Sequence, residues 1–251
     1  MDKVFLKGLT LLETMALKEE PAGVTELAEE LNLNKSNVHR LLQALMHHDF
    51  VYQESASGRY ACTFKLWQLG SRIWSRTDIK PIARPYLMKL HNETLETVHL
   101  SVRQGTDVVY IDKLDCAYAV GTFTTLGGRA PMHCVATGKA ILMALDESEL
   151  ETLPLPFTRH TDKSLTTLAM LRADLVKARK QGVASNRGEW NEGVGGIAAP
   201  IFDASNTVCA AIGLSGPLSR LTPAQLRKHT PLVIQAARDI SRDLGASTAG
   251  A

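Results

Sequence analysis

The chain lacks long hydrophobic runs, clustered cysteines and a strong excess of either charge. No apolar run approaches the ~20 residues that a membrane-spanning helix requires, and the first residues, MDKVFLKG, lack the apolar stretch of a secretory signal. The four cysteines are scattered among 251 residues and form no CxxC pair. Their scarcity and spacing predict reduced thiols in a cytoplasmic protein and argue against a disulfide framework.

Charge is unevenly distributed along the chain, although the formal net charge is only +2. The segment before Cys62 contains six lysines and arginines but nine aspartates and glutamates, whereas residues 62–92 contain six basic residues and one acidic residue. A net negative N-terminal segment counts against a protein that binds nucleic acid non-specifically through its charge. Sequence-specific binding remains compatible with this balance, because the acidic residues cluster outside residues 34–47.

A short helix, a break at NLNKS and a longer helix are predicted within the stretch VTELAEELNLNKSNVHRLLQAL, residues 24–45. The longer helix carries four apolar residues at the i, i+3, i+4, i+7 spacing of one buried face: Val38, Leu41, Leu42 and Leu45. Asn34 is predicted to cap this helix through its side-chain oxygen, and Thr25 to cap the short one. Two helices joined by a short turn are typical of a helix-turn-helix.

The opposite face of the longer helix is polar and is predicted to face DNA. At roughly 100° per residue, the side chains that would contact base edges are those of Ser36, Asn37, His39, Arg40 and Gln43. The next stretch, DFVYQESASGRYAC, predicts a hairpin with strands at residues 50–53 and 59–62, the wing of a winged helix-turn-helix. Lys35 and Arg59, with Lys65 beyond the wing, are predicted to hold phosphates. A small three-helix protein-binding module is the alternative.

Residues 63–76, TFKLWQLGSRIWSR, predict a connecting helix with two apolar stripes. One stripe comprises Leu66, Leu69 and Ile73, and the other comprises Phe64, Trp67 and Trp74. A helix that is apolar on two sides is usually packed on two sides. One stripe would therefore cover the winged helix and the other would meet a second copy of the chain. A helix lying wholly within one domain is the alternative.

The remaining residues predict an α+β domain with an antiparallel sheet. Strands are predicted in VHLSVRQ, VVYIDKL, AYAVGTF, IAAPIFD and VCAAIGLSG, and helices in ARPYLMKLHNETLET, MHCVATGKAILMAL and LTTLAMLRADLVKARKQG. Alternation in VHLSVRQ predicts one buried face, with His99 and Ser101 on the other face. A last helix is predicted to begin at the cap Thr222, with Pro223 in its first position. These patterns divide the chain into a DNA-binding domain at 1–61, a linker helix at 62–77 and a C-terminal domain at 78–246.

Taken in order, these motifs resemble the IclR family of bacterial transcriptional regulators over nearly the whole chain. The similar segments are the helix-turn-helix with its wing, GRAPMHCVATGKAIL, KQGVASNRGEWNEGVGGIAAPIFD and AAIGLSGPLSRLTPAQL. The resemblance implies a winged helix-turn-helix, a linker helix and an effector-binding domain of GAF-like fold. It also implies homodimers, often paired into homotetramers, that bind double-stranded DNA at palindromic promoter sites and respond to a small molecule.

The resemblance places an effector pocket where residues 130–137, a loop at 186–196 and a strand end at 213–215 converge. The corresponding lining residues are Ala130, Ala136, Thr137, Asn186, Gly196, Gly213 and Ser215. A helix N-terminus in the first segment favours an anion, and Trp190 is placed to stack on a ring. The predicted effector is a small carboxylic acid, with an aromatic acid as one option. The alternatives are that the glycines only permit a tight loop, that Trp190 packs in the core and that Thr137 caps a helix.

Two other functional classes have weaker support in the sequence. An enzyme would use the serine of GLSGP or the adjacent His133 and Cys134, but the GxSxG elbow is incomplete and no base is identifiable, so no catalytic residue is predicted. A metal-sensing regulator would use His133, Cys134, His99 and Asp112, which show no recognised ligand spacing. No cofactor and no bound metal are therefore predicted.

Overall fold

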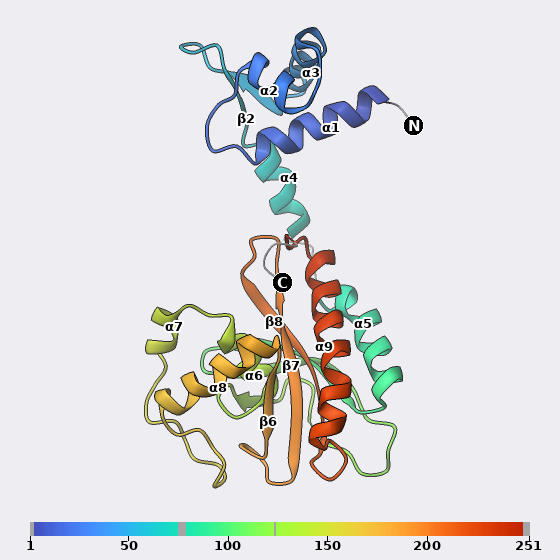
Figure 1. The fold of residues 1–251 in the computed structure, drawn as a ribbon, viewed down its shortest axis with the longest axis vertical. Coiled ribbons are helices and arrows are strands. Elements are labelled where there is room, and N and C mark those ends of the chain that lie inside the picture. Colours follow the sequence, from blue (N-terminus) through green and yellow to red (C-terminus); the bar gives the residue numbers. More distant parts are fainter. Residues whose placement is uncertain (1–2, 75–78, 123, 248–251) are drawn as a thin grey trace. The chain divides into compact units, whose positions relative to one another are not determined.

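The computed structural model describes residues 3–74, 79–122 and 124–247, and the chain divides into two compact units, Met1–Thr77 and Asp78–Ala251 (Figure 1). Each unit has its own hydrophobic core. Among the helices of the described residues, none is both long enough and apolar enough to cross a membrane.

The first unit packs three helices and a two-stranded hairpin around one core. Leu11, Leu27, Val38 and Leu42 have no exposed surface and come from the first three helices. The predicted buried face of the third helix is therefore confirmed, and so is the helix-turn-helix. In chain order the elements are α1 (Lys3–Ala16), α2 (Val24–Glu30), α3 (Lys35–His47), β1 (Val51–Gln53), β2 (Tyr60–Cys62) and α4 (Lys65–Trp74).

The predicted N-cap position of α3 is confirmed but its side-chain hydrogen bond is not, and the predicted cap of α2 was wrong. Asn34 occupies the N-cap position of α3, but its side chain makes no capping hydrogen bond; its backbone carbonyl accepts from the N–H groups of Asn37 (2.9 Å) and Val38 (3.1 Å). Gly23, not Thr25, is the N-cap of α2, and its N–H donates to the carboxylate of Glu26 (3.5 Å). Glu26, at the third helical position, thus accepts from the N–H of the N-cap residue, which is one half of a capping box.

The hairpin predicted as a wing is present as β1 and β2, which pair antiparallel with Gln53 opposite Tyr60. Tyr60 also forms a bridge with Ala22, through hydrogen bonds of 2.8 and 2.9 Å. This bridge joins the wing to the segment that precedes α2. The position of the wing relative to the helix-turn-helix is thus fixed by backbone hydrogen bonds.

The linker helix α4 leaves large apolar side chains uncovered in a single chain. Phe64, just before it, is 81% exposed and Trp67 is 68% exposed, whereas Leu66 is half-buried. Two members of the predicted stripes, Ile73 and Trp74, lie outside the described side chains. The predicted contact of one stripe with a second copy of the chain is not tested by a single chain and stays a prediction.

The second unit is a six-stranded antiparallel sheet, in the order β5-β4-β3-β8-β7-β6, with helices on both faces. This arrangement confirms the predicted α+β class. Its elements are α5 (Ile79–Thr94), β3 (Thr97–Gln104), β4 (Asp107–Leu114), β5 (Arg129–Pro131), α6 (Ala136–Met143), α7 (Glu147–Glu151), α8 (Leu168–Gln181), β6 (Ala184–Arg187), β7 (Val194–Phe202), β8 (Val208–Pro217) and α9 (Pro223–Asp243). The predicted cap is confirmed, since the Thr222 hydroxyl accepts from the Gln225 N–H (3.4 Å).

Two segments differ from the prediction. The stretch AYAVGTF does not form a strand over its described residues 117–122, because other elements satisfy its backbone: the Ala117 N–H donates to the Leu95 carbonyl (3.0 Å) and Arg220 donates to the Val120 carbonyl (3.0 Å). The third strand of this unit, after β3 and β4, is instead the short β5. The expected loop at 186–196 is largely a hairpin, in which Asn186 of β6 pairs with Gly196 of β7.

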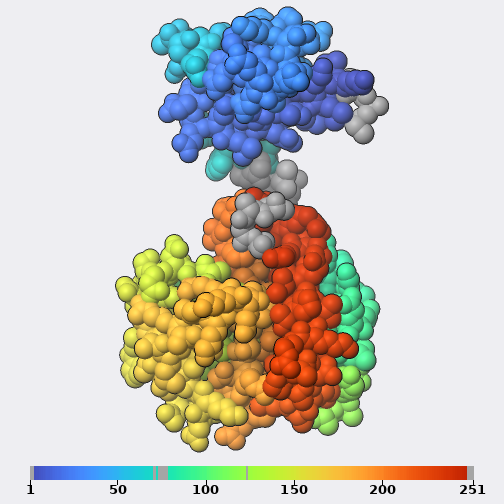
Figure 2. Space-filling view, viewed as in Figure 1, coloured from blue at the N-terminus to red at the C-terminus, as the bar shows by residue number. Residues whose placement is uncertain are grey.

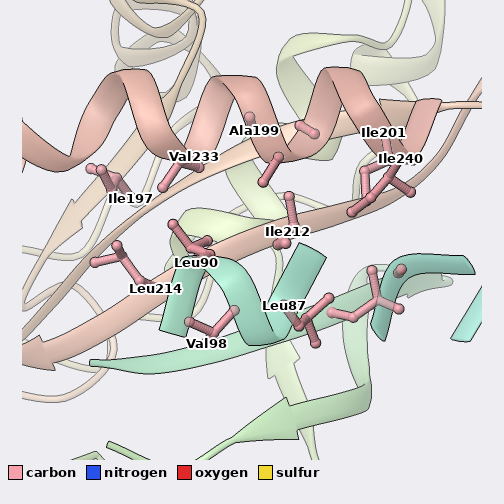
Figure 3. Packing of buried hydrophobic residues seen from close by; sticks show 14 of the residues in the cluster. Leu87, Leu90, Val98, Ile197, Ala199, Ile201, Ile212, Leu214, Val233 and Ile240 are labelled. Atoms are coloured by element: carbon pink, nitrogen blue, oxygen red, sulfur yellow. The ribbon is translucent and has the colours of Figure 1, made fainter. Parts of the chain in front are cut away.

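The two faces of the sheet bury separate clusters because successive side chains on a strand alternate. Ile197 and Ile201 of β7 face α5 and α9, as does Ile212 of β8 (Figure 3), and α9 forms a continuous part of the surface of this unit (Figure 2). Ala198 and Ala211, on the other face, pack with α6 and α8. Small residues on this second face let α6 approach the sheet closely, and every residue of α6 is buried.

Candidate functional site

The polar face of α3 is directed away from the core of the first unit. Five of the side chains predicted to contact DNA are exposed, and Asn37 is half-buried. The exposed ones are Lys35, Ser36, His39, Arg40 and Gln43. Several hydrogen-bonding groups on one outward helix face form the kind of surface that reads base edges in the major groove.

The predicted phosphate contact Arg59 is occupied by groups of its own unit. Its guanidinium donates to the Pro21 carbonyl (2.6 Å) and forms an ion pair with Glu26 (2.6 Å). Lys18 also pairs with Glu26 (3.0 Å) and with Glu30 (2.8 Å). The hydrogen bond from Lys18, and then the one from Gly23, lowers the pKa of Glu26. Arg59 would therefore have to release Pro21 and Glu26 to contact a phosphate. Its predicted role in binding DNA stays a prediction.

Lys65 is likewise engaged within the first unit. Its ammonium donates to the His48 carbonyl (2.6 Å) and lies 4.7 Å from the centroid of the Phe50 ring. The charge stays close to the C-terminal end of α3, where backbone carbonyls lack helical partners and attract a cation.

A small cavity in the second unit brings several predicted effector-binding residues together. Its volume is about 70 Å³. Five of the eight predicted residues line it: Ala136, Thr137, Asn186, Trp190 and Ser215. The other lining residues are His99, Tyr110, Thr122, Thr124, Val135, Asn191, Val194 and Leu214.

The other three predicted positions, Ala130, Gly196 and Gly213, are not among the residues that line this cavity. Ala130 is buried in the core beneath α6. A Cβ on Gly196 would lie 2.4 Å from the carbonyl oxygen of Leu214, and a Cβ on Gly213 would lie 2.6 Å from the Cβ of Ala198. These two glycines therefore permit close strand packing.

An imidazole and three hydroxyl groups form a connected polar wall in the cavity. The Ser215 hydroxyl lies 2.7 Å from Nε2 of His99 and 2.7 Å from the hydroxyl of Thr122, and the Thr124 hydroxyl lies 3.3 Å from Nδ1 of His99. Burial, with a smaller contribution from nearby Lys113, lowers the pKa of His99 to about 4. The imidazole is therefore neutral at pH 7, with one ring nitrogen able to donate and the other able to accept.

The start of α6 supplies the other polar element of the cavity. Its N-cap residue Val135 has extended backbone and contributes no side-chain capping bond, and the first intrahelical bond is donated by the N–H of Lys139 (2.9 Å). The N–H groups of Ala136, Thr137 and Gly138 thus have no helical acceptor. Such a helix start favours an anion.

A buried ion-pair cluster supports the segment between β6 and β7. The side chain of Lys139 in α6 has no exposed surface, and its ammonium lies 2.8 Å from Asp174 of α8 and 3.0 Å from Glu189. The Glu189 carboxylate also accepts a hydrogen bond from the backbone N–H of Arg187. Glu189 immediately precedes Trp190, which lines the cavity, so Lys139 holds this part of the cavity wall in place.

The residues that an enzyme or a metal-sensing regulator would use do not all lie in one site. Asp112 pairs with Arg84 (2.7 Å), and His99 lines the cavity described above. Cys134 is buried, and burial, followed by the charge of Glu189, raises the pKa of its thiol to about 12. This is the opposite of an activated nucleophile. His133 and Cys134 do lie together, but with His160, which the sequence had not indicated.

Comparison with known proteins identifies chains that are similar over nearly the whole length. Residues 5–55 match the IclR helix-turn-helix domain, and residues 71–242 match the family described as bacterial transcriptional regulator IclR C-terminal. The transcriptional regulator KdgR of Escherichia coli is 31% identical over 242 residues, covering 96% of this chain and 92% of KdgR. The repressor AllR of Escherichia coli is 33% identical, covering 95% of this chain and 89% of AllR. The crystal structure of the Agobacterium tumefaciens repressor BlcR superposes with a TM-score of 0.78 at 26% identity and covers 98% of each chain.

Proposed function

Because the chain belongs to the IclR family of bacterial transcriptional regulators, we propose that it binds a specific DNA site under the control of a small organic acid. The named relatives are regulators and repressors of transcription rather than enzymes. The proposal that a small organic acid is the effector rests on the cavity of the second unit. This cavity combines a helix start, whose N–H groups have no helical acceptor, with neutral hydrogen-bonding groups.

The composition of the cavity supports a single carboxylate as the charged group of the effector. The lining residues include no lysine or arginine, so the helix start is the principal attraction for a negative charge there. Hydroxyl and amide groups, such as those of Thr137, Asn186 and Ser215, would bind the remaining polar atoms. The volume of about 70 Å³ favours a short acid, because an aromatic acid would require side chains such as Trp190 to move.

Isothermal titration calorimetry with short-chain and benzoate-like acids tests this proposal, with the neutral amide of each acid as the control. We expect a short acid to bind and its amide to bind much more weakly. Ser215→Ala should weaken acid binding by about tenfold through the loss of one hydrogen bond, whereas Ser205→Ala, in an exposed turn, should not. No heat from any acid, or equal affinity for acid and amide, would contradict the proposal.

Arg40→Ala is expected to weaken binding to the specific DNA site by about 1–3 kcal/mol, because an arginine at the centre of the exposed face of α3 would contact base edges. Fluorescence anisotropy with the DNA upstream of the reading frame and with scrambled DNA measures this change. The matched control is Arg227→Ala, an exposed arginine of α9. Undiminished discrimination between the two DNAs would exclude a reading role for Arg40.

We also propose that the first unit mediates assembly of a dimer. Exposed apolar side chains occur both on α1, where Phe5 is exposed, and around the start of α4, where Phe64 and Trp67 are exposed. Large apolar side chains left exposed in a single chain are candidates for burial at an association site. Sedimentation equilibrium of the wild type and of Phe64→Ser/Trp67→Ser tests this, since the variant should dissociate more readily. A monomeric wild type at micromolar concentration would rule the proposal out.

A further inference from the structure

A second polar cluster lies in the second unit, the proposed effector domain, apart from the proposed effector cavity. His133 and Cys134 come from the segment just before α6, and His160 comes from the connection between α7 and α8. One nitrogen of each imidazole and the sulfur of Cys134 all lie within 4.8 Å of one another. His133 and Cys134 are buried, whereas His160 is exposed. Three ligand-type atoms from two distant segments therefore converge on one point.

The hydrogen bonds of His133 define which of its nitrogens is available. Nε2 lies 3.2 Å from the carbonyl oxygen of Thr158, and a carbonyl can only accept, so Nε2 carries the proton of the neutral ring. Nδ1 is left with a free lone pair. A histidine that donates from one nitrogen to a backbone carbonyl and presents the other is the usual arrangement of a metal ligand. The ring also stacks on Phe157, with centroids 4.7 Å apart, which restricts its rotation.

The backbone that carries His160 is fixed, although its side chain is exposed. The hydroxyl of the buried Ser164 accepts from the N–H groups of His160 and Thr161, both at 2.9 Å, and donates to the carbonyl of Glu189 (2.6 Å). The Thr161 hydroxyl donates to the carbonyl of Gly188 (2.7 Å). This part of the connection is therefore tied to the segment between β6 and β7 and holds His160 beside Cys134.

We propose that His133, Cys134 and His160 bind a zinc ion. Two imidazoles and one thiolate suit zinc and do not suit calcium or magnesium, which prefer oxygen ligands. Tetrahedral zinc at ordinary bond lengths sets its ligand atoms about 3.5 Å apart, so the three groups need to approach one another by no more than roughly 1 Å. The exposed imidazole of His160 has room to make this movement.

A neighbouring cavity leaves space for a fourth ligand. Its volume is about 290 Å³, and its lining includes His133 and His160 together with Asp107, Phe157 and Thr158. Three protein ligands with an open fourth position are typical of zinc sites that accept water or another small ligand. The Asp107 carboxylate already accepts from Arg129 (3.1 Å), so solvent is the expected fourth ligand.

The site also adjoins two segments of the effector cavity. Cys134 is followed directly by Val135, Ala136 and Thr137, which line that cavity. The His160 connection is bonded to Gly188 and Glu189, which precede the lining residues Trp190 and Asn191. Bound zinc would restrain both segments and so favour one shape of the effector cavity.

Cobalt and zinc titrations of the full chain, after removal of metal with a chelator, test the site. We expect one equivalent of Co²⁺ to give a thiolate-to-metal charge-transfer band, which Zn²⁺ then removes by displacement. Cys134→Ser should abolish the band. His160→Gln should weaken zinc binding by at least about 100-fold, since loss of even an outer partner of a metal ligand typically costs 10–100-fold. His48→Gln, an exposed histidine of the first unit, is the matched control and should bind like the wild type.

His160 is exposed, so His160→Gln is expected to keep the wild-type circular dichroism and melting curve. That variant therefore decides the question even if Cys134→Ser, which alters a buried residue, folds poorly. The proposal is overturned if the wild type shows no charge-transfer band, if Cys134→Ser retains the band, or if His160→Gln binds zinc as tightly as the wild type.

Discussion

Lys139→Met is expected to lower the free energy of unfolding of the effector domain by about 3–5 kcal/mol, the usual cost of removing one partner from a buried ion pair. Methionine has a similar volume, so the loss would come mainly from charge and not from a cavity. The carboxylates of Asp174 and Glu189 would lose their shared cation, and Glu189 is itself largely buried. The segment before Trp190 should loosen as a result.

Differential scanning calorimetry of the full chain measures this change in the transition of the second unit. Lys177→Met, an exposed lysine of the same unit, is the matched control and should change stability by less than about 0.5 kcal/mol. Adding Glu189→Gln to Lys139→Met should restore part of the stability, because one unpaired carboxylate becomes neutral. An unchanged transition in Lys139→Met would mean that the ion pairs do not stabilise the fold.

Acidification is expected to remove about 3 kcal/mol of stability from the effector domain through His99 alone. The folded domain holds the pKa of His99 at about 4, below its ordinary value of 6.5. Between these two values the unfolded chain binds a proton that the folded chain does not, so stability falls as pH decreases. The stabilisation is complete above pH 6.5 and is lost progressively toward pH 4, at about 1.4 kcal/mol per pH unit.

Urea unfolding between pH 7 and 4 measures this dependence, and His99→Gln isolates it. Burial also lowers the pKa values of His133 and His229, so the wild type should lose more stability than His99 alone explains. His99→Gln should show a shallower fall over the same range, while His48→Gln, exposed in the first unit, should follow the wild type. An identical pH dependence in His99→Gln and the wild type would show that folding does not lower the pKa of His99.

The helix-turn-helix was predictable because its signals are local. Val38, Leu41 and Leu42 repeat with the period of a helix within a few residues, and the break between α2 and α3 is short. The start of α2 was less predictable, since Thr25 and Gly23 are both compatible with a helix start and the choice between them depends on a contact between Gly23 and Glu26. Local periodicity thus identifies a helix more reliably than it identifies the residue at which the helix begins.

The cavity was only partly predictable because its walls come from distant strands and connections. Alternation in β3 indicated a single buried face, and this was wrong: α6 covers the second face as well, so that His99 and Ser101 are also buried. Thr122 and Thr124 lie in the connection between β4 and β5, where the sequence had predicted a strand over AYAVGTF. The resemblance to a family supplied Ala136, Thr137 and Ser215, but not the imidazole to which Ser215 is bonded.

The strand order of the effector domain has a consequence for how the chain folds during synthesis. The two centre strands are β3 and β8, and Leu100 pairs with Ile212. The ribosome must therefore synthesise more than 100 residues after β3 before this pairing can form. The helix-turn-helix depends on contacts within the first 77 residues and can form on the ribosome much earlier. Until β8 emerges, β3 keeps one unpaired edge, which is the kind of surface that leads to aggregation. We therefore expect the nascent chain to pass through a stage with a folded DNA-binding unit and a chaperone-dependent remainder.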